Sequence, residues 1–459
     1  MNTVVSRYAP SPTGLLHAGN YRTAVFSYLF AKHSSGKFIV RIEDTDAARS
    51  KKEYEDNIFE TLEWLKLPAD EIYRQSEHRA RHRELLEKLV AEDLAYISKE
   101  APKKEGDREE VIRFRNPGGD RSFTDVIHGE IKTNVDDLGD FIIARSFDEP
   151  VFHFAVVVDD ADEGVTHIIR GGDHISNTAR QMLIRNALGF PEPLYAHLPL
   201  IMDSDHKKLG KRTGAKALTE YRDMGILPEA LLNYVAFLGW NPGDDREYLS
   251  HDELIESFDL SRVQKGSAIF DETKLLSVNQ HWMRELSSEK FLACLDIGSP
   301  TSDVGLPMSY NSEILQKAVP LLKERAKSFS EAREMLGNEL KCLFEEPLLN
   351  RDQLLIKEPK ELPGMTKTTL ECLSEPIKAL PAGRQAFQEG ISAEEVKNAI
   401  MPLANAEEAK WKGGRGAVLW PLRYALSGQD RSPDPFTLIS IIGIKETTAR
   451  VGKAIAILE

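Results

Sequence analysis

The chain has 459 residues, of which 41% are hydrophobic and 29% are charged, and its formal net charge is −14. This composition is typical of a globular protein of about three domains, and the acidic total argues against a non-specific coat on nucleic acid or membranes. Cys294, Cys342 and Cys372 lie far apart, which excludes a disulfide scaffold. Without a signal-like start or an apolar run of about 18 residues, the sequence predicts a cytoplasmic protein with no membrane partner.

The first half of the chain predicts alternating strands and helices. Apolar and β-branched runs predict strands at 4–8, 38–42, 111–114, 141–145, 154–158, 166–170 and 196–201. Helical spacing of apolar residues predicts helices at 17–33, 51–65, 77–94 and 175–188. This order is typical of a doubly wound α/β domain, here interrupted by an insertion near residues 80–150. After about residue 217 the strands are expected to stop, and helices are predicted at 218–224, 228–238, 252–258 and in most later segments.

A proline- and glycine-rich turn, residues 7–20, joins the first predicted strand to the first predicted helix. The start of such a helix offers backbone N–H groups and the positive end of a dipole, which together suit a phosphate. Gly14 and Gly19 would let a nucleotide approach the backbone, and His17 could donate to a phosphate oxygen. A plain polar helix cap is the alternative for His17.

This segment resembles the first motif of class I aminoacyl-tRNA synthetases of the glutamyl type. The likeness covers Arg7–Asn20, Arg22–Ala24 and Arg41–Asp46, with Ala18 in place of a common isoleucine. The resemblance implies a Rossmann-like catalytic domain that uses ATP, with Mg²⁺ as the counterion of ATP. The residues that it assigns to ATP in this segment are Pro10, Thr13, Gly14, His17, Gly19 and Asn20.

A second basic segment, His206–Lys216, holds five Lys or Arg residues and no acid. By itself it would be a solvated turn, but Lys208–Arg212 resembles the second motif of the family, with Gly210 in place of serine. Lysines on a mobile loop suit the charge that develops on a triphosphate. The resemblance therefore adds Lys208, Lys211 and Arg212 to the ATP site, and it makes His17 and Lys211 the expected catalytic residues.

The amino-acid substrate implied by the resemblance is L-glutamate, which needs cations for two carboxylates and an anion for its ammonium. Arg7 and Arg170 are expected to bind carboxylates, because a guanidinium matches a carboxylate bidentately, and Glu43 is expected to bind the ammonium. For each of Arg7, Arg170 and Glu43, a structural salt bridge is the alternative to substrate binding. Ala9, Ser11 and Phe152 match other pocket positions, and Asp44 is expected at the tRNA acceptor end. Phe152 replaces a usual tyrosine, and Gly172 replaces a usual glutamate.

Two features of the sequence bear on metal binding: the acidic pair Asp159–Asp160 and the composition of the insertion. Asp159 and Asp160 are expected to close the strand at 154–158, where they could bind a metal or, as in the family, shape the pocket. Many bacterial relatives carry a zinc-binding stretch in the insertion, but residues 97–110 hold no Cys or His. We therefore expect no structural zinc and no metal bound by protein residues.

The resemblance implies a catalytic domain in two halves, an insertion that contacts the acceptor end, and helical tRNA-binding regions. The expected bounds are 1–80 and 151–205 for the catalytic halves, 81–150 for the insertion, 206–290 for a stem-contact domain carrying the second motif, and 291–459 for anticodon-binding domains. The expected partner is tRNA(Glu), with tRNA(Gln) left open, and the expected state is a monomer. A glutaminyl enzyme, a relative that glutamylates a tRNA base, and a non-catalytic tRNA-binding relative remain as rivals.

The net charge is compatible with a selective RNA partner because the basic residues are clustered. Residues 1–50 hold six Lys or Arg and three acids, and the basic segment at 206–216 holds five Lys or Arg and no acid. Local basic patches can bind one RNA while the acidic remainder discourages non-specific binding.

Overall fold

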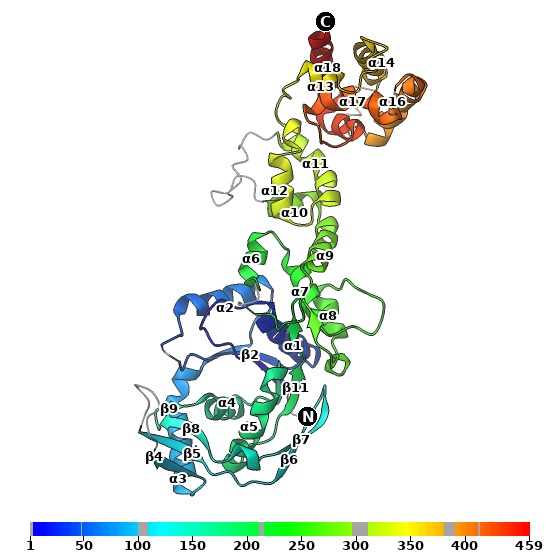
Figure 1. The fold of residues 1–459 in the computed structure, drawn as a ribbon. Coiled ribbons are helices and arrows are strands. Elements are labelled where there is room, and N and C mark those ends of the chain that lie inside the picture. Colours follow the sequence, from blue (N-terminus) through cyan, green and yellow to red (C-terminus); the bar gives the residue numbers. More distant parts are fainter. Residues whose placement is uncertain are drawn as a thin grey trace. The chain divides into compact units, whose positions relative to one another are not determined.

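The computed structural model describes residues 3–46, 48–99, 109–210, 215–295, 311–380, 391–411 and 414–459. It divides into two compact units, Met1–Trp282 and Met283–Glu459, and each is described here by itself. Within the described residues, all strands lie in the first unit, and the second unit is built of helices (Figure 1). The prediction of an α/β region followed by a helical region is therefore confirmed.

The first unit is built around a seven-stranded sheet with the order β3-β2-β1-β10-β11-β6-β7. Neighbouring strands are parallel except for β6 and β7, which form an antiparallel hairpin at one edge. The strand order changes direction on the two sides of β1, which creates a crevice beyond the carboxyl ends of β1 and β10. The strands are β1 Val5–Tyr8, β2 Lys37–Ile42, β3 Glu71–Arg74, β6 Asp120–Asp125, β7 Gly129–Asn134, β10 His167–Gly171 and β11 Leu194–Leu198.

Three helices connect the parallel strands, and the sequence analysis predicted all three but missed β3, which follows the second of them. Helix α1 (Ala18–His33) joins β1 to β2, α2 (Lys52–Trp64) joins β2 to β3, and α5 (Ile175–Leu188) joins β10 to β11. Helix α1 packs on β1, β2 and β10, and its central residues are almost fully buried. Both ends of the loop between β1 and α1 are therefore anchored in the packed core.

The insertion contributes to two sheets. Its β6–β7 hairpin, which the sequence analysis missed, extends the main sheet beside β11. Its other strands form an antiparallel sheet of β4 (Ala95–Lys99), β5 (Glu110–Phe114), β8 (Phe141–Ser146) and β9 (Glu149–Pro150). This second sheet shares one hydrophobic core with α3 (Arg79–Ala91), with α5 and with the helix that follows β9.

The strand predicted at 154–158 is wrong: these residues lie in helix α4 (Phe152–Asp162). Every residue from Phe154 to Asp160 in that helix is buried. A helix that is buried all round has an uninterrupted apolar run, and hydrophobic periodicity cannot distinguish such a run from a buried strand. Asp159 and Asp160 therefore project from a helix and do not close a strand.

The remainder of the first unit is mainly helical, and one short strand pair corrects the expectation that strands end near residue 217. Strands β12 (Ile201–Met202) and β13 (Ala268–Ile269) pair in parallel. The helices are α6 Leu218–Asp223, α7 Pro228–Ala236 and α8 His251–Ser257, and α9 Glu272–Glu285 begins in this unit. Proline at the first position of α7 fits the start of a helix, where its missing N–H costs no hydrogen bond.

The helices of the second unit bury apolar faces against one another. Helix α18 contacts α14, α16 and α17, and it bends at Gly443, whose φ is 83°. The helices are α10 Ser288–Leu295, α11 Ser312–Arg325, α12 Phe329–Gly337, α13 Arg351–Leu355, α14 Met365–Ala379, α16 Ala393–Glu407, α17 Gly414–Ser427 and α18 Pro435–Leu458. Among the described residues, no helix combines the length and the apolar character needed to cross a membrane.

Gly36 gives a test of how closely β1 and β2 approach. A Cβ atom at this position would lie 2.3 Å from the carbonyl oxygen of Val4, which accepts the Lys37 N–H at 2.8 Å. We expect Gly36→Ala to lower the free energy of unfolding by about 1–3 kcal/mol, measured by urea denaturation, because the backbone must move. Gly266→Ala is the control, since nothing lies within 4 Å of its Cβ position. Equal stability of the two variants would contradict this account.

Candidate active site

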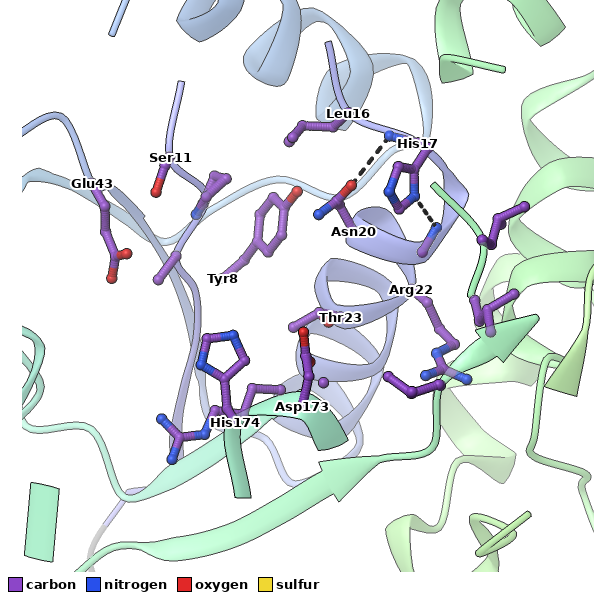
Figure 2. Close-up of a pocket in the computed structure, with 18 of the residues that line it drawn as sticks. Tyr8, Ser11, Leu16, His17, Asn20, Arg22, Thr23, Glu43, Asp173 and His174 are labelled. Carbon is purple, nitrogen blue, oxygen red and sulfur yellow. Dashed lines mark hydrogen bonds between the residues drawn. The ribbon is translucent and has the colours of Figure 1, made fainter. Parts of the chain in front are cut away.

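The loop between β1 and α1 is fixed by the helix cap that His17 forms. The His17 Nδ1 atom accepts a hydrogen bond from the Gly19 N–H at 3.1 Å, and the Asn20 side chain accepts one from the His17 N–H at 3.3 Å (Figure 2). Because Nδ1 is an acceptor, a neutral His17 ring carries its proton on Nε2, which is then a donor. The cap and the donor are therefore compatible functions of the same ring.

Gly19 is required by the position of the histidine ring. A Cβ atom at Gly19 would lie 2.9 Å from Cε1 and 3.0 Å from Nδ1 of His17. The structure thus gives Gly19 a local packing reason in addition to the predicted approach of a nucleotide. Gly14 is buried and does not line the cavity next to the loop.

A cavity of about 590 Å³ lies beyond the carboxyl ends of β1 and β10. Figure 2 shows Tyr8, Glu43, His17 and His174 around it, contributed by segments that are far apart in the sequence. Most of the predicted site residues meet here. They are Arg7, Ala9, Pro10, Ser11, Thr13, His17, Gly19, Asn20, Glu43, Phe152, Arg170 and Lys208.

Arg170 is a buried cation that has no anionic partner in the described part of the chain. Its Nε atom donates to His197 Nε2 at 3.1 Å, and its terminal nitrogens donate to Gln181 Oε1 at 2.8 Å and Thr178 Oγ1 at 2.7 Å. Burial lowers the pKa of Arg170 to about 10, so the group is still charged at neutral pH. A buried charge that hydrogen-bonds only to neutral groups is costly, and a ligand carboxylate would relieve that cost.

Arg7 belongs to a buried ionic cluster behind the cavity. Its Nε atom lies 3.0 Å from Asp160 Oδ1, and Arg41 lies 2.9 Å from the same oxygen. Arg41 also lies 2.6 Å from Glu163 and 3.5 Å from Glu43. The cluster therefore connects β1, β2 and α4 through charged side chains.

Asp159 lies on the same helix and faces the histidines of α3 and the turn before it. Its carboxylate lies 2.7 Å from His82 Nε2, 3.0 Å from His78 Nδ1 and 2.7 Å from Gln75 Nε2. No group of three or more metal-ligating side chains is present among the described residues. Asp159 and Asp160 are thus engaged by cations and hydrogen-bond donors.

Glu43 and Phe152 line the cavity and also a neighbouring one of about 780 Å³. Burial raises the pKa of Glu43, and the Glu43 N–H donates to the Pro10 carbonyl at 3.0 Å, which ties the loop to the end of β2. Phe152 is 38% exposed, and its ring centroid lies 5.8 Å from that of His174. Burial, with the charge of nearby Arg170, lowers the pKa of His174 to about 4, so this ring is neutral at pH 7.

Besides Gly14, three predicted residues lie outside the cavity or outside the described residues. Both carboxylate oxygens of Asp44 accept hydrogen bonds from Ser76, at 2.8 Å from N and 2.6 Å from Oγ. Asp44 lines neither cavity. Lys211 and Arg212 fall in 211–214, outside the described residues, whereas Lys208 is described and lies 2.8 Å from Asp173.

Among the cavity residues that the sequence analysis did not assign are the polar side chains that follow β10: Asp173, His174 and Asn177. They follow β10 directly, in the short helix η3 (Gly172–His174) and the first turn of α5. The signal was present, because residues after a parallel strand that neighbours β1 lie at the same edge as the loop. Gly172 also has a packing reason, since a Cβ atom there would lie 3.0 Å from the Leu198 carbonyl oxygen.

The family model of class I tRNA synthetases (E and Q), catalytic domain, matches residues 3–110 and 98–277 of the chain. The chain belongs to this family. A model of an anticodon binding domain matches residues 288–455 of this class I synthetase.

Individual members of the family are similar over most or all of the chain. A glutamate–tRNA ligase of Geobacter sulfurreducens is 36% identical over 100% of both chains. One of Aquifex aeolicus is 46% identical over 62% of this chain and 68% of the relative. The crystal structure of a glutamate tRNA ligase from Elizabethkingia meningosepticum, in complex with its amino acid, superimposes with a TM-score of 0.83 at 31% identity and covers 100% of both chains.

Glu163 gives a pH test of the buried cluster in this synthetase. Burial raises the pKa of Glu163 from 4.5 to about 8, and its Oε1 atom is buried with no hydrogen-bond partner in the described structure. Folding therefore takes up a proton, so this contribution to stability is full below pH 4.5 and is lost as the pH rises through about 8. We expect Glu163→Gln to equal the wild type at about pH 4 and below, and to exceed it in free energy of unfolding at about pH 9.

The measurement is urea denaturation of both proteins across this pH range. Glu77→Gln serves as the control, because Glu77 is an exposed glutamate of the same unit. A difference between Glu163→Gln and the wild type that stays constant with pH would contradict the assignment.

Proposed function

We propose that the chain is a glutamate–tRNA ligase, which activates L-glutamate with ATP and transfers the glutamyl group to the 3′ end of tRNA(Glu). The observation that carries the proposal is the buried Arg170, which hydrogen-bonds to neutral groups only and lines the same cavity as Arg7, Glu43 and His17. Two cations and one anion match the two carboxylates and one ammonium of glutamate.

In this proposal, Arg7 and Arg170 bind the carboxylates of glutamate and Glu43 binds its ammonium. The burial of all three supports these roles, because an ion pair formed away from water is screened little. Ala9, Ser11 and Phe152 complete the wall of the cavity. Arg7 is compensated by Asp160, so Arg170 supplies the uncompensated positive charge that attracts an anionic substrate.

ATP is proposed to lie against the loop and the start of α1. The helix N-terminus and a His17 Nε2 donor suit its phosphates, with Lys208 close to the same cavity. Pro10, Thr13, Gly14, Gly19 and Asn20 would shape the loop, and Lys211 and Arg212 are assigned from their motif alone. Mg²⁺ would arrive with ATP, because it binds preferentially through phosphate oxygens and water.

The first step needs no general base, because the glutamate α-carboxylate is already ionised at pH 7. A carboxylate oxygen forms a bond to the α-phosphorus, and the bond from that phosphorus to pyrophosphate breaks, giving glutamyl-adenylate. A ribose hydroxyl of the terminal tRNA nucleotide then forms an ester with the glutamyl carbonyl as AMP leaves. His17 and Lys211 would stabilise the charge that develops on the phosphates in the first step.

The neighbouring cavity is proposed to receive the acceptor end of the tRNA. It shares Ser11, Thr13, Glu43 and Phe152 with the first cavity, which would bring the acceptor end next to the proposed glutamate site. Its wall carries both signs of charge, from three arginines and four acids: Arg49, Arg79, Arg145, Glu43, Asp46, Asp148 and Glu149. Asp44 would act there indirectly, by holding Ser76 through two hydrogen bonds. The insertion at 81–150 is thereby proposed as the acceptor-end region, between catalytic halves at 1–80 and 151–205.

We further propose that residues 206–290 contact the tRNA stem and that residues 291–459 bind the anticodon. The protein is proposed to act as a monomer in the cytoplasm. The match of the anticodon-domain model to 288–455 supports the second assignment. Whether tRNA(Gln) is also charged depends on these anticodon contacts. The absence of a structural zinc from the insertion stays a prediction.

Arg170→Gln tests the amino-acid site. The variant removes the uncompensated positive charge, so we expect the KM for glutamate to rise about 10- to 100-fold while the KM for ATP changes less than about two-fold. Steady-state charging of tRNA(Glu) gives both constants. Arg246→Gln, an exposed arginine paired with Asp244, is the matched control and should leave both unchanged. An equal rise in both KM values would contradict a glutamate site.

Charging assays with tRNA(Glu) and tRNA(Gln) transcripts test the reaction itself. We expect the wild type to glutamylate tRNA(Glu), and we expect Lys211→Ala to lower that rate about 10²- to 10³-fold, as loss of a transition-state donor does. A wild type that makes no glutamyl-tRNA with either transcript would refute the enzymatic proposal. A Lys211→Ala rate close to that of the wild type would refute the role of the second motif alone.

A further inference from the structure

Behind the proposed glutamate site, one carboxylate holds two buried arginines. Asp160 Oδ1 lies 3.0 Å from Arg7 Nε and 2.9 Å from an Arg41 terminal nitrogen. The side chains of all three residues are at most 4% exposed. Asp160 lies on α4 and lines neither cavity, so it cannot contact a ligand there directly.

The contact to Arg7 uses only one edge of the guanidinium. In the described structure, the Nε atom of Arg7 makes the hydrogen bond to Asp160, and its two terminal nitrogens make none. Neither terminal nitrogen is a fully buried atom, and Arg7 lines the cavity. An arginine held at Nε with its outer edge open is preorganised for bidentate binding of a carboxylate.

Asp160 is itself fixed in place and charged. Burial alone would raise its pKa, but the charges of Arg7, Arg41 and Arg185 outweigh burial and lower the pKa to about 2. Arg41 cannot follow Asp160 freely, because it also contacts Glu163 at 2.6 Å and Glu43 at 3.5 Å. The carboxylate therefore keeps a defined position relative to β1 and β2.

We propose that Asp160 is a positioning residue for glutamate, which fixes the Arg7 guanidinium so that its outer edge faces the substrate carboxylate. This inference rests on the proposed function, in which Arg7 binds glutamate. The alternative is that Asp160 only compensates the buried charge of Arg41. A compensating role affects stability, whereas a positioning role also changes the KM for glutamate.

Asp160→Asn is the primary variant, with Glu163→Gln as a control for the contact to Arg41. Asp160 is charged and contacts both Arg41 and Arg7, whereas Glu163 contacts only Arg41 and, with a pKa of about 8, is mainly uncharged at pH 7. The comparison at constant charge is Asp160→Glu, described below. In charging of tRNA(Glu) at pH 7, we expect Asp160→Asn to raise the KM for glutamate at least about 10-fold and to change the KM for ATP less than about two-fold. Glu163→Gln should change the KM for glutamate and the KM for ATP by less than about two-fold.

A double-mutant cycle with Arg7→Lys separates positioning from compensation. Lysine has no Nε–H group in the chain and no second donor edge, so Asp160 has nothing to orient in that background. We expect Asp160→Asn to add less than about two-fold to the KM for glutamate of Arg7→Lys. The same 10-fold rise in both backgrounds would overturn the proposal.

Asp160→Glu is the second variant, in case the loss of charge prevents folding. It keeps the charge but displaces the carboxylate by one methylene, so a positioning role again predicts a higher KM for glutamate. A wild-type KM for this variant, or a rise equal to that of Glu163→Gln, would overturn the inference. Failure of the wild type to charge tRNA(Glu) would instead refute the proposed function, so the two failures are distinguishable.

Discussion

Arg41 has no exposed surface, and its guanidinium lies within 4.0 Å of four carboxylates, those of Glu43, Asp159, Asp160 and Glu163. One buried cation among four acids is stable only if other cations share them or if one acid is protonated. Both occur, since Arg7 shares Asp160 and the pKa of Glu163 rises to about 8. The end of β1, the end of β2 and helix α4 therefore have fixed relative positions, and residues of each line the cavity proposed for glutamate.

This constraint divides the tasks of the site between two arginines. Arg7 is oriented by a carboxylate and carries little net charge toward the cavity, whereas Arg170 is oriented by His197, Gln181 and Thr178 and keeps its full charge. Directional hydrogen bonding and electrostatic attraction thus come from different side chains. In the proposed glutamate site, two such groups would bind an amino acid with two carboxylates at a lower desolvation cost than two uncompensated arginines.

The sequence predicted the parts of the site that follow local rules, and it failed where tertiary contacts decide. His17 was predicted because a strand, a Pro/Gly-rich turn and a helix follow one another in a short span. Helix α4 was misread because its residues from Phe154 to Asp160 are all buried, which removes the polar face that reveals a helix. Arg41 was read as part of a motif, but its pairing with Glu163 spans 122 residues and no local pattern encodes it.

The β6–β7 hairpin has a consequence for how the chain can be divided. The hairpin comes from the insertion, yet β6 pairs with β11 of the main sheet. A shortened protein that lacks the insertion would leave the β11 edge with open N–H and C=O groups, which favour self-association. Residues 81–150 are therefore not a detachable module, and chimeras that exchange this segment between relatives must keep a strand that pairs with β11.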